Sequence, residues 1–152
     1  GIHYGGPRRM KRVGPLGIPQ ILVPACVDFS VHHTTSISDE FKSRPIYDHN
    51  PEFALARCTK EEMGTIGAYF AECANTSVGP VEIVIPGEGY SIPNVPGGVF
   101  WDRDADATFE TELMKNLNSD IPVEKLPLHA NSDEFGIAVA QRFLALISVR
   151  EK

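Results

Sequence analysis

The sequence predicts an α/β fold in which a parallel β-sheet carries helices on both faces. Three short apolar segments, at residues 18–23, 81–85 and 122–128, have the length and β-branched content of buried strands. Segments with the apolar spacing of helices lie between these strands and after the last one. Because alternating strands and helices form parallel sheets, we expect residues 1–152 to be one α/β subdomain, three-layered and Rossmann-like or flavodoxin-like.

The first residues resemble the junction between a strand and a helix. Gly5-Gly6-Pro7 precedes residues 8–13, for which we expect a helix because proline suits the first helical turn. A domain rarely begins at such a junction, so we expect further sequence upstream of it; the resemblance described below implies that the chain is the C-terminal half of a larger unit with two subdomains. After the first strand, residues 24–58 predict irregular structure, with a short helix near 38–42 and a small strand at 45–47.

Three longer helices follow. Thr59-Lys60-Glu61-Glu62 is a capping box, in which Thr59 and Glu62 satisfy each other's backbone N–H groups. A second helix is expected at 105–117 with Asp102 or Asp104 as its cap, after a loop rich in glycine and proline at 86–102. A third follows Ser132. Helical spacing predicts these core residues: Met63, Ile66, Phe70 and Cys73; Phe109, Leu113 and Leu117; Phe135, Val139, Phe143, Leu144 and Ile147.

Composition excludes several classes of protein. The 152 residues include 20 acidic and 14 basic side chains, which gives a net charge of −6. We do not expect DNA binding, because neutralising phosphates requires clustered lysine and arginine. No apolar run approaches the roughly 20 residues of a membrane-spanning helix. Three widely spaced cysteines without a CxxC pair argue against disulfides or structural zinc and favour a cytoplasmic location, with Cys58 and Cys73 packed in a helical region.

The polar residues that could bind a ligand or take part in a reaction gather where the predicted strands end. Parallel strands with right-handed crossovers bring their carboxyl ends to one edge of the sheet, where ligands bind. We therefore expect one site formed by residues from four strand ends, in chain order Gly5, Gly6 and Arg8; Cys26 and Asp28; Gly87, Gly89 and Ser91; His129 and Asn131.

Each of these residues has an expected role. The N–H groups of the two glycine pairs can approach a phosphate because glycine has no Cβ. Arg8 would add a bidentate positive charge. Asp28 would hold a metal ion or a ribose hydroxyl, and Cys26 would be an apolar wall. The competing interpretation is that these loops only cap the sheet.

Histidines offer a second kind of chemistry. His49 and His129 are the candidate catalytic bases. His32 and His33 are adjacent and lack the HxxxH or HExxH spacing of metal sites, so no resident metal is expected. Whether the protein is an enzyme stays open at this point.

Several segments, in order along nearly the whole chain, resemble one known family. They are Gly5-Gly-Pro-Arg-Arg-Met10, Gly17-Ile-Pro-Gln20, Tyr47-Asp-His-Asn-Pro51, Arg57-Cys-Thr-Lys-Glu-Glu62, Pro86-Gly-Glu-Gly-Tyr-Ser91, Pro96-Gly-Gly-Val-Phe-Trp-Asp102 and His129-Ala-Asn131. Together they resemble the second half of the ATP-binding domain of the tomato mosaic virus resistance protein family. Residues 31–36 depart from the resemblance by being rich in histidine.

The resemblance implies a ligand and partners. It implies ATP, with Mg²⁺ accompanying the nucleotide, a homodimer, and contact with an N-terminal subdomain that holds much of the nucleotide site. Our first hypothesis is therefore a nucleotide- or phosphoester-binding subdomain. The alternatives are an enzyme that acts on a small metabolite through a histidine base, and a non-catalytic module that binds another protein.

Overall fold

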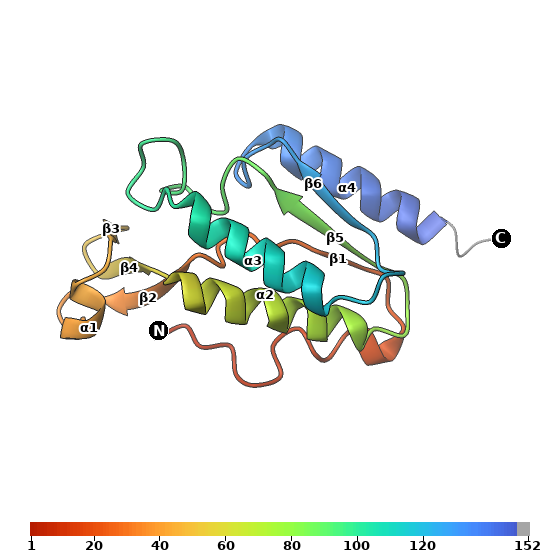
Figure 1. The fold of residues 1–152 in the computed structure, drawn as a ribbon, viewed down its shortest axis with the longest axis horizontal. Coiled ribbons are helices and arrows are strands. Elements are labelled where there is room, and N and C mark those ends of the chain that lie inside the picture. Colours follow the sequence, from red (N-terminus) through yellow and green to blue (C-terminus); the bar gives the residue numbers. More distant parts are fainter. Residues whose placement is uncertain (149–152) are drawn as a thin grey trace.

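The three predicted strands form one parallel sheet in the computed structural model, which describes residues 1–148 (Figure 1). They are β1 (Gln20–Leu22), β5 (Val81–Pro86) and β6 (Val123–Leu126), in the order β1-β5-β6. Ile21 lies opposite Glu82, and Ile83 lies opposite Val123. The predicted parallel pairing is confirmed, and helices flank the sheet.

Two helices, α2 (Lys60–Asn75) and α3 (Arg103–Asn116), lie side by side against this sheet (Figure 1). The predicted capping box begins α2: the Thr59 hydroxyl accepts from the Glu62 N–H group, and the Glu62 carboxylate accepts from Thr59. Asp102 caps α3. The main core lies between these helices and the sheet and includes Met63, Phe70, Val81, Ile83, Ile85, Tyr90, Phe109 and Leu113.

The closest approach of the two helices depends on a glycine. A Cβ atom added to Gly67 of α2 would lie only 2.2 Å from the carbonyl oxygen of Phe109 in α3. Only a residue without a Cβ lets the two backbones meet at this distance.

The last helix, α4 (Asp133–Ser148), is less well covered. It contacts β1, and Phe135 is its one buried residue among those that the structure describes. The predicted core face is wrong in part, because Leu144 is 62% exposed and Phe143 is 39% exposed. Arg142 instead forms ion pairs with Glu82 of β5 and Glu124 of β6.

A second sheet was not predicted. It contains β2 (Phe29–His33), β3 (Ile46–Asp48) and β4 (Phe53–Arg57), antiparallel and in the order β2-β4-β3. The expected short helix and small strand are present as α1 (Asp39–Lys42) and β3. The prediction of irregular structure for residues 24–58 is otherwise wrong. β4 lacks the alternation of polar and apolar residues that marks a strand, and its partner β2 lies on the far side of residues 34–52.

The predicted helix at residues 8–13 is also wrong. Those residues form isolated turns, in which Arg9 donates to Gly6 and Lys11 donates to Arg8 through the backbone. Met10 adopts a left-handed conformation with φ of 65°. Only a short 3₁₀ helix, η1 (Gly14–Leu16), follows. Six mostly charged residues offer no apolar face, so packing cannot offset the cost of starting a helix.

None of the helices within residues 1–148 is long and apolar enough to cross a membrane.

Candidate functional site

The structure brings together residues from three of the four predicted strand ends. Ser91, in the loop after β5, donates through Oγ to Asp28 Oδ2 at 2.7 Å. The Ser91 carbonyl oxygen lies 3.0 Å from His129 Nε2, which comes from the segment after β6. The N–H group of Cys26, after β1, donates to the Tyr90 carbonyl at 2.8 Å. The carboxyl ends of the parallel strands therefore meet at one edge, as the topology requires.

Asp28 and Ser91 face the interior of the protein and not a cleft. Both are fully buried, and they belong to a network of five buried polar side chains. Arg57, at the end of β4, donates from Nη2 to Asp106 Oδ1 at 2.6 Å and from Nη1 to the Asp28 carbonyl at 3.0 Å. Asn94 Nδ2 donates to Asp28 Oδ2 at 3.1 Å and to Asp106 Oδ2 at 3.1 Å. We call these five residues the buried polar network: Asp28, Arg57, Ser91, Asn94 and Asp106.

The sequence reasoning missed three members of this network. Asp106 carries a signal that could have been used, because it shares the helical spacing of the buried Phe109 and Leu113. Burial raises the pKa of Asp106, and Arg57 and Asn94 oppose this effect. Arg57 ends an apolar strand, and Asn94 lies in the long loop, so neither is marked by periodicity.

Both ring nitrogens of His129 are engaged. The N–H group of Asn131 donates to His129 Nδ1 at 3.1 Å, so Nε2 carries the proton and donates to the Ser91 carbonyl. His129 and Asn131 thus close the loops at this edge, and no ring lone pair remains for a substrate. His49 lies elsewhere, in the exposed turn between β3 and β4, where its N–H group donates to the Phe53 carbonyl.

The loop glycines have structural roles. The N–H group of Gly87 donates to the Leu126 carbonyl at 2.7 Å, which extends the β5–β6 pairing and removes that donor from any phosphate. A Cβ atom on Gly89 would lie 1.9 Å from the Asn94 carbonyl oxygen, and its φ of +131° is one that other residues rarely adopt. A Cβ atom on Gly87 would lie 2.6 Å from the Leu126 carbonyl oxygen, so both positions need glycine for the fold of the loop.

The fourth predicted strand end lies in a different place. No helix begins at Gly5-Gly6, and Arg8 is exposed in the turns that follow. This segment is attached to α2, because the Tyr69 hydroxyl donates to the Arg9 carbonyl at 2.7 Å and Lys11 pairs with Glu72. Figure 1 shows the N-terminal trace running along that helix.

A cleft of about 640 Å³ opens between this segment, the end of β1 and α2. Cys26 lies in its wall with a left-handed backbone, φ 56°, and an exposed side chain. Partial burial and the nearby Asp28 raise the pKa of the Cys26 thiol, which disfavours the reactive thiolate. Other residues lining the cleft are His3, Tyr4, Arg9, Met10, Tyr69 and Phe70.

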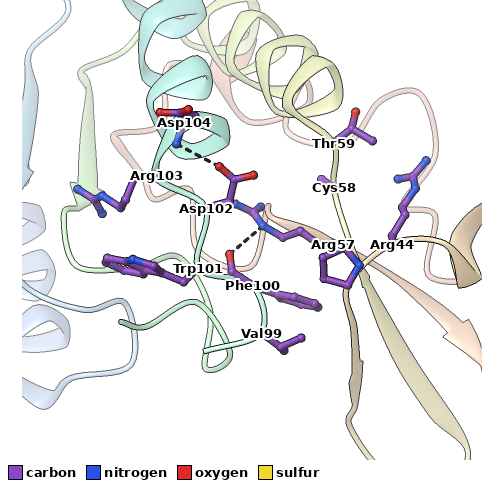
Figure 2. A pocket seen from close by; sticks show the side chains of 11 residues that line it. Arg44, Arg57, Cys58, Thr59, Val99, Phe100, Trp101, Asp102, Arg103 and Asp104 are labelled. Carbon is purple, nitrogen blue, oxygen red and sulfur yellow. Dashed lines mark hydrogen bonds between the residues drawn. The ribbon is translucent and has the colours of Figure 1, made fainter. Parts of the chain in front are cut away.

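A second cleft of about 470 Å³ lies where α2 and α3 begin (Figure 2). Arg103 lies over the Trp101 ring, 5.0 Å from its centroid, and donates to the Gly87 carbonyl. The other two arginines in its wall are already neutralised: Arg44 pairs with Glu40 and Glu62, and Arg57 pairs with Asp106. Because side chains of Thr59 and Asp102 already cap both helix N-termini here, this cleft is poorly suited to an anion.

Among residues 1–148, the cysteines and the carboxylates do not assemble a metal site. Cys73 is buried in α2, and Cys58 packs against the main core just before it, as predicted. Burial raises the pKa of the Cys58 thiol to about 11. Within the part of the chain that the structure describes, no three His, Cys, Asp or Glu side chains are grouped so that they could hold a metal ion.

Comparisons with known proteins give a consistent family. Residues 1–147 match the C-terminal domain described as Uncharacterised protein family (UPF0261). A UPF0261 protein from Clostridium tetani is 31% identical over the whole chain, which covers 37% of that relative. A UPF0261 protein from Mesorhizobium japonicum is 30% identical over 87% of the chain and 34% of the relative.

A plant protein is also similar. The ToMV resistance protein Tm-1(GCR237) of Solanum lycopersicum is 32% identical over 85% of the chain, which covers 18% of that protein. The chain thus spans little more than a third of the length of these two bacterial relatives, and less of the plant protein. These matches confirm the resemblance found in the sequence: the chain belongs to the UPF0261 family and corresponds to its C-terminal domain.

Proposed function

We propose that this domain contributes to a binding site for a nucleotide or another phosphoester, with ATP as the first candidate, in the cleft beside β1. The distribution of charge carries the proposal. The first 27 residues hold four basic side chains, Arg8, Arg9, Lys11 and Arg12, and no acidic one, in a chain whose net charge is −6. Of the four side chains in this basic segment, Arg9 lines the cleft at the carboxyl end of β1, and Lys11 is already paired with Glu72. A concentrated positive charge at the edge where parallel sheets bind ligands favours an anion.

The other side chains in the cleft suit the rest of a nucleotide. Tyr4 is 76% exposed, and Tyr69 lies on the facing helix. Flat aromatic faces stack on bases, and the apolar residues of β1 would cover a ring or a sugar. The volume of about 640 Å³ is in the usual range for small-molecule sites.

The residues present do not fit Mg²⁺ at Asp28. Asp28 is fully buried, and its Oδ2 atom already accepts hydrogen bonds from Ser91 and Asn94. Mg²⁺ keeps most of its water ligands and needs an accessible carboxylate. We therefore derive no step through a metal ion from this chain, and we assign the recognition of phosphate to the basic segment.

Substitution of Arg9 with alanine tests the proposal. Arg9 lines the cleft, whereas Arg12 belongs to the same basic segment without lining it. If one charge-assisted hydrogen bond contributes about 1.5 kcal/mol, Arg9→Ala should weaken ATP binding by roughly tenfold in titration calorimetry. Arg8 does not line the cleft, so Arg8→Ala should weaken ATP binding less than Arg9→Ala.

Arg12→Ala is the matched control, because it removes the same charge from outside the cleft. A loss of affinity equal to that of Arg9→Ala would indicate general electrostatic attraction and no specific contact. The absence of ATP and pyrophosphate binding to the unsubstituted chain at millimolar concentration would overturn a site carried by this domain alone.

We further propose that the apolar surface beside β1 packs against the remainder of the longer family proteins. Val139 and Phe143 of α4 line a groove of about 510 Å³ with Ile21 and Leu22 of β1. Leu16 is 71% exposed nearby in the chain. With that neighbour in place, the arrangement would be three-layered and Rossmann-like. A homodimer through the same surface is the alternative, and analytical ultracentrifugation of this chain at increasing concentration distinguishes a monomer from a dimer.

A further inference from the structure

The cleft beside β1 offers little charge to a ligand. Of the described residues that line it, Arg9 is the one whose side chain carries a permanent charge, and none is an aspartate or a glutamate. The Arg9 side chain is exposed and takes part in none of the ion pairs formed within residues 1–148. A ligand in this cleft therefore meets one guanidinium and no carboxylate.

Lys11 belongs to the same basic segment but is already engaged on α2. Its Nζ atom lies 2.6 Å from Glu72 Oε1 and 4.8 Å from the centroid of the Tyr69 ring. The hydrogen bond to Glu72 raises the pKa of Lys11, so the ammonium group stays charged and is neutralised by this partner. Among residues 8–12, Arg9 and Met10 line the cleft, so Arg9 alone presents its charge there.

Arg9 is held in place at both its backbone and its side chain. The Tyr69 hydroxyl donates to the Arg9 carbonyl at 2.7 Å, which ties this turn to α2. The Arg9 side chain lies against Gly5, where an added Cβ atom would be 2.9 Å from Arg9 Cδ and 3.0 Å from Arg9 Nη1. The next residue, Met10, packs against the main core. Because the turn is already ordered, less conformational freedom is lost when the guanidinium binds an anion.

The rest of the cleft wall is largely apolar and aromatic. It includes Tyr4, Tyr69 and Phe70, together with the apolar residues of β1. Such a wall suits a flat ring attached to the anion. A chain of several phosphates would need several cations, or a metal ion held by carboxylates, and the described lining offers neither. The lining therefore matches a ligand that joins one ring system to one anionic group.

We propose that the unit recognised in this cleft is a nucleoside monophosphate, whose single phosphate group is bound by Arg9 and whose ring lies on the aromatic wall. This inference rests on the proposed function and narrows its class of ligand. When ATP binds, the same contacts hold the ring and the first phosphate, while the other two phosphates gain no cation and are repelled by the net charge of −6. Tyr69 is a positioning residue, because its hydroxyl group acts on the phosphate only through Arg9.

Titration calorimetry with adenosine, AMP and ATP tests the proposal on the unsubstituted chain. AMP should bind about tenfold more tightly than adenosine, because one charge-assisted hydrogen bond contributes about that factor. ATP should bind no more tightly than AMP, and Mg²⁺ should not raise the affinity for ATP. Tighter binding of ATP than of AMP would overturn this inference and leave the proposed function standing. Failure of all three ligands to bind at millimolar concentration would overturn both.

Tyr69→Phe separates positioning from stacking, because it keeps the ring and removes only the hydroxyl group that holds Arg9. The variant should bind AMP roughly threefold to tenfold more weakly and bind adenosine as before. In an Arg9→Ala background, the same substitution should have no further effect on AMP. Equal losses of AMP and adenosine affinity in Tyr69→Phe would indicate damage to the whole cleft and would overturn the positioning role.

The ratio of AMP affinity to adenosine affinity is the decisive quantity for the other variants. Arg9→Ala should bring this ratio close to one, whereas Arg12→Ala, the matched control outside the cleft, should leave it unchanged. Gly5→Ala should lower the ratio without lowering the Tm, because the added methyl group meets only the flexible side chain of Arg9. An unchanged ratio in a folded Arg9→Ala protein would overturn the proposal.

Discussion

On one face of the parallel sheet, Val81, Ile83 and Ile85 pack under α2 and α3, whereas on the other face Glu82 meets Arg142 of α4. The residues of β5 alternate between these two environments along a single strand. The first environment is apolar and closed. The second combines an ion pair with apolar side chains that stay partly exposed. The comparison teaches that an amphipathic sequence identifies a helix and its apolar face but not whether that face is covered within the same domain.

The largest difference should come from truncating one aromatic side chain on each face. Phe109 is fully buried and contacts the rings of Phe70 and Tyr90 at centroid distances of 5.5 and 5.6 Å. Phe109→Ala should lower the free energy of unfolding by about 3–5 kcal/mol in guanidinium denaturation. Phe143→Ala on α4 is the matched control and should cost much less, because Phe143 is 39% exposed. Equal losses would show that the two faces do not differ.

Glycine-to-alanine substitutions should change stability in opposite directions on the two faces. Gly67→Ala should destabilise by about 1–3 kcal/mol, because the added methyl group meets the backbone of α3 at 2.2 Å. A methyl group added to Gly136 of α4 would have nothing within 4 Å, so Gly136→Ala should stabilise by up to about 1 kcal/mol through helix propensity. Chemical denaturation of both variants measures this contrast, and a stable Gly67→Ala protein would contradict the close contact between helices.

Helix caps should have the same effect on both faces. Thr59 caps α2, and the Ser132 hydroxyl accepts from the Phe135 N–H group at the start of α4. Because a cap acts within one turn, Thr59→Ala and Ser132→Ala should each cost about 1 kcal/mol. Thermal unfolding of the two variants checks this expectation. A much smaller loss for Ser132 would indicate that α4 frays even in the unsubstituted protein.

The smallest effect should come from polar substitution on the exposed side of α4. Leu144 is 62% exposed, so Leu144→Gln should change the free energy of unfolding by no more than about 0.5 kcal/mol. Denaturation at two protein concentrations measures it. A large loss that grows with protein concentration would show that Leu144 is covered by a second copy of the chain.

Features encoded locally were predictable from the sequence. The capping box at Thr59 and Glu62 depends on residues three positions apart, and the strand at 81–85 is apolar except for Glu82. The sheet-edge rule also brought Asp28, Ser91 and His129 to one place. The position of a residue at this edge does not predict where its side chain points. Asp28 and Ser91 point into the protein and bind each other there.

Features that depend on distant partners were not predictable. β2 and β4 become strands by pairing with each other, and Arg57 meets Asp106 across 49 positions of the chain. The helix expected at residues 8–13 failed for the opposite reason, because proline and glycine signals were present but no apolar face was. The cleft beside β1 was not predictable for both reasons. Its wall includes turns within residues 8–13, which were predicted to be a helix, and residues of α2 some 60 positions away.

The attachment of α4 through Arg142 has a consequence for how the molecule responds to salt. Arg142 bridges Glu82 and Glu124 on neighbouring strands, and both of its partners remain partly accessible to water. Dissolved ions screen such charges over about 8 Å at physiological ionic strength but leave apolar contacts intact. Raising the ionic strength should therefore loosen α4 selectively, and amide protons of this helix should exchange with solvent sooner while those of α2 and α3 stay protected. At high salt concentration, α4 would then open independently of α2 and α3.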